Sequence, residues 1–293
     1  MKLGFKLMLF VMTISIIGCK NEAANKEKEK TEIDEKTIDH DGVKLSFDDL
    51  GEGDTTLFLV HGWAINKEYW QHQVTYFSKN YRVVVIDLPG FGESGTNRSN
   101  WSVENYAADI SAVIHKLKLR NVILVGHSMS GVIVLEAALK NPETVIGIVG
   151  VDNFKTYGIQ VTPEEKAESE KIYKRLRSNY TSTITQYTQQ YLLSPQTDSI
   201  IGKRILSDII ETDSVIAVNV LEANDQFPAD DRLNEYGKTL YLINSSFFPN
   251  DTSAFKKNNI PYKLFDIGKT GHYPMLEKPD EFNKYLRMIL RDV

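Results

Sequence analysis

The chain is poor in several features that mark particular classes of protein. Its 293 residues include a single cysteine, Cys19, which excludes an intramolecular disulfide and a cysteine-rich metal site. The net charge is −5 and no basic tract is interleaved with aromatic residues, which argues against nucleic acid as a partner. No internal repeat or shift of composition divides the chain into independent domains. The composition is otherwise that of an ordinary globular protein, and the chain is long enough for one large core.

The chain also lacks an apolar run that would cross a membrane comfortably. Leu7 to Ile17 follows a basic start and has only the length of a signal-peptide core. It leads into Ile16-Ile17-Gly18-Cys19, which resembles the bacterial lipobox, in which the cysteine is lipidated and becomes the mature N-terminus. Residues 1–18 are therefore predicted to be a signal peptide and Cys19 a lipidation site. An incidental cysteine in an ordinary signal segment is the alternative.

The residues that follow Cys19 are rich in charge and almost free of large apolar side chains. Such a segment cannot bury enough surface to fold, so residues 19–36 are interpreted as a tether that leads to a folded domain at 37–293. A lipid-anchored lipoprotein of the bacterial cell envelope, exported and associated with a membrane through its N-terminus, is the predicted localisation.

Short apolar runs alternate with helical patterns over most of the predicted domain. Thr37 to Leu50 is expected to form an edge hairpin closed by Gly51-Glu52-Gly53. The alternation predicts an α/β fold with a mostly parallel, doubly wound sheet. Buried strands are expected at Leu57–Val60, Val83–Ile86, Val122–Val125, Val145–Val151, Leu240–Ile243 and Tyr262–Phe265.

Residues 153–238 interrupt this alternation. They contain no convincing buried strand, and Tyr180, Ile184, Tyr187 and Tyr191 recur at helical spacing. The two strands that flank this segment place it beside the C-terminal edge of the sheet, where ligands bind in open α/β folds. A helical cap over that edge is therefore predicted. The tyrosine stripe would either line its pocket or pack in its core.

Ser128 lies between an apolar strand and a helix, in Gly126-His127-Ser128-Met129-Ser130-Gly131. Small residues around a serine at such a turn are typical of a nucleophile elbow, in which strand and helix nearly touch. The fifth position of the Gly-x-Ser-x-Gly pattern is here Ser130, and the glycine comes one residue later. A serine hydroxyl needs an imidazole to take its proton before it becomes a good nucleophile at neutral pH.

Four separated motifs occur in one order along residues 37–293. They are His61-Gly62-Trp63, Asp87-Leu88-Pro89-Gly90-Phe91-Gly92-Glu93-Ser94, the Ser128 elbow, and Gly271-His272-Tyr273-Pro274. With these motifs the domain resembles the α/β-hydrolase family, members of which carry a helical cap and a serine nucleophile. The resemblance implies Ser128 as nucleophile, His272 as base, and the main-chain N–H groups of Trp63 and Met129 as the oxyanion hole. His127 is expected to pack, and His61 to shape its loop.

The third catalytic residue is less clearly marked. Family members usually carry the acid in a Gly-x-x-Asp turn after the strand that follows the cap, but here the glycine is missing and Asp251 comes late. A minority of the family places the acid one strand earlier, which corresponds to Asp152 at the end of a predicted central strand. Asp152 is the favoured acid and Asp251 the alternative.

The resemblance implies a serine hydrolase that cleaves small or medium carboxylic esters or related acyl substrates through an acyl-enzyme. No metal or organic cofactor is implied, and the expected partner is a small-molecule ester or acyl substrate. A carbon–carbon bond hydrolase with the same triad is one alternative. A non-catalytic ligand-binding lipoprotein of the same fold is the other, because fold alone does not establish a reaction.

Overall fold

The computed structural model describes residues 35–293. The predicted signal peptide, the predicted lipidation site Cys19 and the predicted tether up to residue 34 lie outside the described residues. The first strand begins at Glu35, two residues before the expected start of the domain. Among the described residues, none of the helices has the length and apolar character needed to span a membrane.

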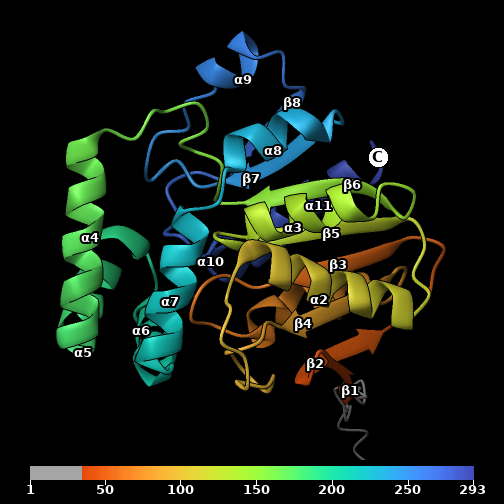
Figure 1. Cartoon of the computed structure of the whole chain (residues 1–293). Coiled ribbons are helices and arrows are strands. Elements are labelled where there is room, and N and C mark those ends of the chain that lie inside the picture. The colour runs from red at the N-terminus through yellow and green to blue at the C-terminus, as the bar shows by residue number, and fades with distance from the viewer. Residues whose placement is uncertain (1–34) are drawn as a thin grey trace, which may run out of the picture. The chain divides into compact units, whose positions relative to one another are not determined.

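An eight-stranded sheet forms the centre of the described chain (Figure 1), in the order β1-β2-β4-β3-β5-β6-β7-β8. The pairs β1–β2 and β2–β4 are antiparallel, and all pairs from β4 to β8 are parallel. The predicted mostly parallel sheet is therefore confirmed. The strands are β1 Glu35–His40, β2 Val43–Leu50, β3 Thr56–Val60, β4 Arg82–Asp87, β5 Val122–His127, β6 Val145–Val151, β7 Leu240–Asn244 and β8 Tyr262–Asp266.

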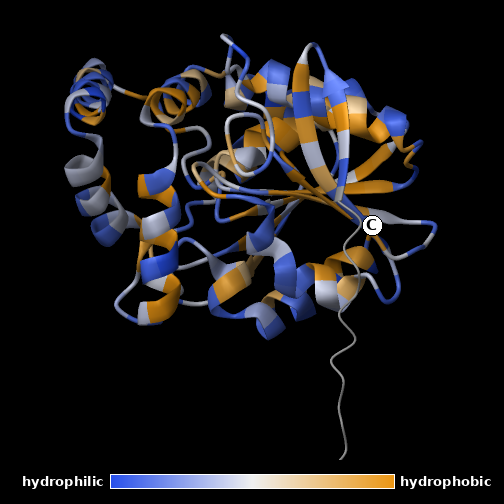
Figure 2. Ribbon diagram, turned by 90° about the horizontal axis from the view of Figure 1, so that it is seen from below, coloured by the Kyte–Doolittle hydropathy of each residue, from blue (hydrophilic) through white to orange (hydrophobic). Residues whose placement is uncertain are grey.

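The central strands are largely apolar because helices cover both of their faces. Every residue of β3, β5 and β7 is buried, whereas the edge strand β8 has only half-buried and exposed residues. A strand without a solvent face has no position at which polar residues alternate with apolar ones. Figure 2 shows the hydrophobic residues gathered on the strands and on the inward sides of the helices.

The first hairpin turns at a different place from the one expected. The turn lies at Asp41–Gly42, where both residues have positive φ (53° and 76°), and His40 pairs with Val43. A two-residue turn with two positive φ angles matches the twist of a hairpin, and Asp-Gly suits it. The segment Gly51-Glu52-Gly53 instead leads from β2 to β3, so the predicted closure at these residues is wrong.

Two helical layers cover the sheet. On one face α3 packs against both α2 and α8, and on the other lie α10 and α11 (Figure 1), which α1 contacts. Ser102 caps α2 as its sequence position suggests, because its hydroxyl accepts a hydrogen bond from the N–H of Asn105. The bounds of these helices, and of the short helices η1 and α9, are η1 Lys67–Trp70, α1 Gln71–Phe77, α2 Val103–Lys116, α3 Ser130–Lys140, α8 Ala229–Tyr236, α9 Ser253–Lys257, α10 Pro274–Glu277 and α11 Pro279–Leu290.

The predicted helical insertion lies between β6 and β7. Within residues 153–238 the structure has helices and no strand. Its last helix, α8, packs against α3 and therefore extends the helical layer of the sheet, while the preceding helices form the cap. These are α4 Pro163–Ser178, α5 Tyr180–Tyr187, the π-helix η2 Thr188–Leu192, α6 Ser199–Glu211 and α7 Ser214–Asp225.

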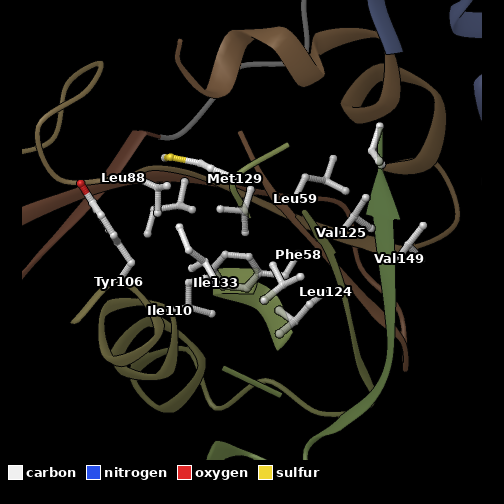
Figure 3. Packing of buried hydrophobic residues seen from close by; sticks show 14 of the residues in the cluster. Phe58, Leu59, Leu88, Tyr106, Ile110, Leu124, Val125, Met129, Ile133 and Val149 are labelled. Atoms are coloured by element: carbon white, nitrogen blue, oxygen red, sulfur yellow. The ribbon is translucent and has the colours of Figure 1, made fainter. Parts of the chain in front are cut away.

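Leu124 tests how much the central packing contributes to stability. Its side chain in β5 is 0% exposed and packs with Phe58 and Ile133 (Figure 3). We expect Leu124→Ala to lower the free energy of unfolding by about 2–5 kcal/mol, because it removes buried methyl groups and leaves a cavity. Urea denaturation measures the change.

The matched control is Ile200→Ala on α6, where the side chain is 76% exposed. We expect its effect to stay within about 0.5 kcal/mol. Equal losses in the two variants would contradict this account of the core.

Candidate active site

Ser128 occupies the tight turn between β5 and α3. Its backbone is left-handed, with φ of 54°, a conformation that costs a non-glycine residue on the order of 1 kcal/mol. Two main-chain hydrogen bonds hold it there: its N–H donates to the carbonyl of Val151 (2.9 Å), and its carbonyl accepts from the N–H of Gly131 (2.9 Å). The turn holds the half-buried hydroxyl at the C-terminal edge of the sheet, beyond the end of the strand.

The contacts at residues 130 and 131 explain the departure from the usual elbow pattern. A Cβ on Gly131 would lie 2.2 Å from Nδ2 of Asn153, so the steric need for glycine falls at this position. Ser130 is fully buried, and its hydroxyl donates to the carbonyl of His61. The serine therefore joins the elbow to the loop after β3. Gly126 is needed at the first position, since a Cβ there would lie 2.3 Å from the carbonyl oxygen of Ser130.

The structure brings Ser128, His272 and Asp152 together. Nε2 of His272 lies 2.7 Å from the hydroxyl oxygen of Ser128, and Nδ1 of His272 lies 2.6 Å from Oδ2 of Asp152. Asp152 follows the last residue of β6, and His272 lies in the loop between β8 and α10. In this arrangement Nδ1–H donates to the carboxylate and Nε2 is left to accept the serine proton.

The carboxylate of Asp152 is buried and fully engaged. Its Oδ1 accepts hydrogen bonds from the N–H of Ser245 (2.9 Å) and lies 2.6 Å from the ammonium of Lys155. Burial alone would raise the pKa of Asp152, but the hydrogen bond and charge of His272, together with the ammonium of Lys155, outweigh it and lower this pKa. Asp152 is therefore ionised at neutral pH and able to stabilise a positive charge on His272.

Asp251 lies elsewhere. Its exposed carboxylate accepts a hydrogen bond from the N–H of Ser253 (2.9 Å), at the start of the short helix α9. Among the described residues, Asp152 is the acidic side chain that bonds to His272, and Asp251 makes no such contact. The geometry therefore favours the acid at the end of β6.

Two contacts hold the main chain of His272. Its N–H donates to the carbonyl of Leu192 at the end of the π-helix η2 (2.8 Å), and its carbonyl lies 2.7 Å from Nε2 of His127. Burial and the neighbouring His272 lower the pKa of His127 to about 3, so His127 is neutral and its Nε2–H is the donor. His127 was expected only to pack, but it also anchors the His272 loop.

The loop after β3 presents Trp63 beside the elbow. Among the described residues, the main-chain N–H groups of Trp63 and Met129 donate to no other main-chain group, which leaves both available to an external oxygen. The indole N–H of Trp63 donates to the carbonyl of Ala217 in α7 (2.7 Å). This bond ties the loop to the cap.

His61 shapes this loop, as expected. Its Nδ1 lies 2.7 Å from the carbonyl of Gly62 and its Nε2 accepts a hydrogen bond from the N–H of Leu88 (2.9 Å). Burial lowers the pKa of His61, so the ring is neutral and serves as one donor and one acceptor within the core.

Two cavities adjoin Ser128, and both are bounded by the cap. The smaller has a volume of about 580 Å³ and is lined by Trp63, His272 and Tyr273 of the core and by apolar cap residues that include Ile184. Tyr187 and Tyr191 of the predicted stripe also line it and remain 41% and 43% exposed. Part of the stripe therefore faces the cavity rather than the core.

The larger cavity has a volume of about 1170 Å³. It extends along the loop after β6 towards α4 and α7, and its wall carries charged residues such as Lys166, Glu170 and Asp225. Ser128, Met129, Asp152 and Lys155 line both cavities. A bound molecule can therefore reach Ser128 from two chemically different sides.

Sequence reasoning missed the role of Lys155. It comes three residues after Asp152 in a loop without periodic pattern, and a lysine in such a loop is usually solvated. The one signal available was its position three residues after a strand-end aspartate. That signal helps only once Asp152 has been assigned as the acid. Ser245, whose N–H also bonds Asp152, carries no sequence signal because its contribution comes from the backbone.

A family model described as the alpha/beta hydrolase fold matches residues 55–279. The chain is 24% identical over 253 residues to a pimeloyl-[acyl-carrier protein] methyl ester esterase of Proteus mirabilis. The match covers 83% of this chain and 95% of that protein. It is also 24% identical over 243 residues to karrikin insensitive 2 receptor CA of Petunia hybrida, covering 79% of this chain and 90% of that protein.

Among solved structures, a thermophilic esterase from Thermogutta terrifontis has the same fold. It superimposes with a TM-score of 0.75 at 21% identity, covering 88% of this chain and 98% of that chain.

The two candidate acids predict different reactivities of Ser128. We expect Asp152→Asn to slow the reaction of Ser128 with a fluorophosphonate by about four orders of magnitude, because the amide favours the wrong imidazole tautomer. Asp251→Asn should change the rate less than about tenfold, since its exposed carboxylate only accepts a hydrogen bond from the N–H of Ser253. The labelling rate is measured by intact-protein mass spectrometry. The reverse ranking would assign the acid to Asp251, and two small effects would exclude both residues.

Proposed function

The chain belongs to the alpha/beta hydrolase family, and from that premise we propose that it is a serine hydrolase that cleaves small or medium carboxylic esters or related acyl compounds. Ser128 is the proposed nucleophile, His272 the general base, and Asp152 the acid that orients His272. The observation that carries the proposal is the pair of hydrogen bonds from Ser128 to His272 (2.7 Å) and from His272 to Asp152 (2.6 Å).

The first step is an attack by the Ser128 hydroxyl oxygen on the acyl carbon. Nε2 of His272 takes the hydroxyl proton, and the electron pair of the carbonyl bond moves to the carbonyl oxygen. The main-chain N–H groups of Trp63 and Met129 would donate to that oxyanion. Donors of this kind typically lower the barrier by about 3 kcal/mol each.

The second step releases the alcohol. The tetrahedral intermediate collapses as the bond from its carbon to the leaving oxygen breaks, and His272 returns its proton to that oxygen. Water then attacks the acyl-enzyme with the same assistance and frees Ser128. Throughout, the ionised carboxylate of Asp152 stabilises the imidazolium form of His272.

The two cavities suggest how a substrate would be divided. Because His272 protonates the leaving group, that group should lie in the smaller cavity of about 580 Å³, which His272 lines. Aliphatic and aromatic side chains dominate its wall, which favours an apolar alcohol portion. The acyl portion would extend into the larger cavity with its charged wall. Both volumes suit substrates of small or medium size.

Turnover of p-nitrophenyl butyrate tests the assignment. We expect Ser128→Ala to reduce kcat/KM by several orders of magnitude, because no other group replaces the nucleophile. The matched control is Ser169→Ala, since Ser169 lines both cavities without contacting His272. Its activity should stay within about tenfold of the wild type. Undiminished turnover in Ser128→Ala would refute the proposed nucleophile.

We also propose that Cys19 carries a lipid that anchors the protein to a membrane of the bacterial envelope. The support is the sequence alone: an apolar run of signal length that ends in Ile16-Ile17-Gly18-Cys19, followed by a charged segment.

Phase partitioning tests the anchor. The protein expressed with its full N-terminus should enter the detergent phase of Triton X-114, because an acylated cysteine adds buried CH₂ groups. Cys19→Ala should leave it in the aqueous phase. If both forms partition alike, Cys19 is not the anchor.

A further inference from the structure

Lys155 lies against the proposed catalytic acid. Its ammonium is 2.6 Å from Oδ1 of Asp152 and donates to the carbonyl of Ser245 (2.9 Å). The Lys155 side chain is 16% exposed, and the Asp152 side chain is 6% exposed. A lysine that gives up most of its hydration for two such contacts is held in one place rather than left as a mobile surface charge.

The two side-chain partners of Asp152 contact different oxygens of its carboxylate. Nδ1 of His272 bonds to Oδ2, while Lys155 approaches Oδ1. When His272 is neutral, the negative charge of Asp152 is already balanced by Lys155. When His272 takes a proton, the site therefore carries one excess positive charge, in surroundings where charge interactions are stronger than in water.

We propose that Lys155 is a positioning residue that holds Asp152 and extends the activity of the enzyme to lower pH. This inference rests on the proposed function, since it assumes that Asp152 and His272 act as acid and base. The ammonium repels the imidazolium of His272 and offsets part of the stabilisation from Asp152. Protonation of His272, which removes the base, is therefore less favourable beside Lys155 than it would be without that ammonium.

The other ionisable groups near His272 do not replace Lys155 in this role. The ring of His127 lies 4.8 Å from that of His272, but burial keeps it neutral. Tyr273, 5.5 Å away, is also neutral because burial raises the pKa of its hydroxyl. Glu277 is engaged by the N–H of Gly271 and the hydroxyl of Thr197.

Two further groups face the same cavities from the cap. Tyr173 and Asp225 bond to each other, and burial raises the pKa of both side chains. Both groups are the same in wild type and in every variant of Lys155. A difference in pH profile between those proteins therefore reports on Lys155 itself.

The pH dependence of kcat/KM for p-nitrophenyl butyrate tests the proposal, read at the isosbestic wavelength of p-nitrophenol. We expect the acid limb of Lys155→Gln and of Lys155→Met to move to higher pH by about one unit, which lowers kcat/KM about tenfold on that limb. Lys155→Arg keeps the charge and should keep the wild-type limb. Lys171→Gln removes an exposed lysine of α4 that pairs with Glu168 and lines neither cavity, and should also leave the limb unchanged.

A second measurement is independent of turnover. The imidazole Cε1–H resonance of His272 is identified by its loss in His272→Gln and followed against pH by NMR. Its titration midpoint should be higher by about one pH unit in Lys155→Gln than in the wild type. Circular dichroism establishes that each variant is folded.

The results separate the two proposals. If Ser128→Ala retains turnover, the proposed function is wrong, and the NMR titration alone then decides whether Lys155 acts on His272. If turnover depends on Ser128 but neither neutral variant moves the acid limb or the titration midpoint, the inference about Lys155 is wrong and the proposed function stands. A lower plateau with an unmoved limb would make Lys155 a purely structural residue, which also overturns the inference.

Discussion

The close approach of β5 and α3 is the constraint on which the site depends. A Cβ at Gly126 would overlap the carbonyl of Ser130, so the strand and helix pack as tightly as their backbones allow. That packing leaves Ser128 no regular conformation and holds it at φ of 54°. The strain is offset by the surrounding sheet, in which β3, β5 and β6 lie side by side in the core. The hydroxyl is thereby held still at the edge where His272 and Asp152 arrive from other strands.

The cap takes part in the site as well as covering it. Two of the loops around Ser128 are tied to the cap by hydrogen bonds, which include the indole of Trp63 to Ala217 in α7 and the main chain of His272 to Leu192 at the end of η2. A π-helix is an uncommon element that is frequent at functional sites, and here its last carbonyl accepts the N–H of His272. Movement of the cap would therefore disturb both the loop after β3 and the position of His272.

Buried polar groups around Asp152 are matched to one another. The carboxylate of Asp152 accepts hydrogen bonds from His272 and the N–H of Ser245 and forms an ion pair with Lys155. Its buried negative charge is therefore not left unpaired. The hydroxyl of Ser130 and the Nε2–H of His127 likewise donate to main-chain carbonyls of neighbouring loops. Apart from the ion pair of Asp152 with Lys155, three residues away, each of these bonds joins segments that lie far apart in the chain. The polar network therefore sets the mutual position of the loops, while the apolar strands beneath them supply the stability.

The sequence by itself determined the parallel sheet, the helical insertion, and Ser128 and His272 as the candidate nucleophile and base. These follow from local causes: continuous apolar runs need two covered faces, and small residues around a serine need a tight turn. It ranked Asp152 above Asp251 from the end of a strand but could not decide between them, because that depends on which carboxylate meets a histidine 120 residues away. Tertiary structure alone decided that contact, the ion pair of Lys155, the bond of Ser130 to the loop after β3, and the hairpin turn at Asp41–Gly42. Two turns with glycine were available there, and the pairing of β2 with both β1 and β4 selects between them.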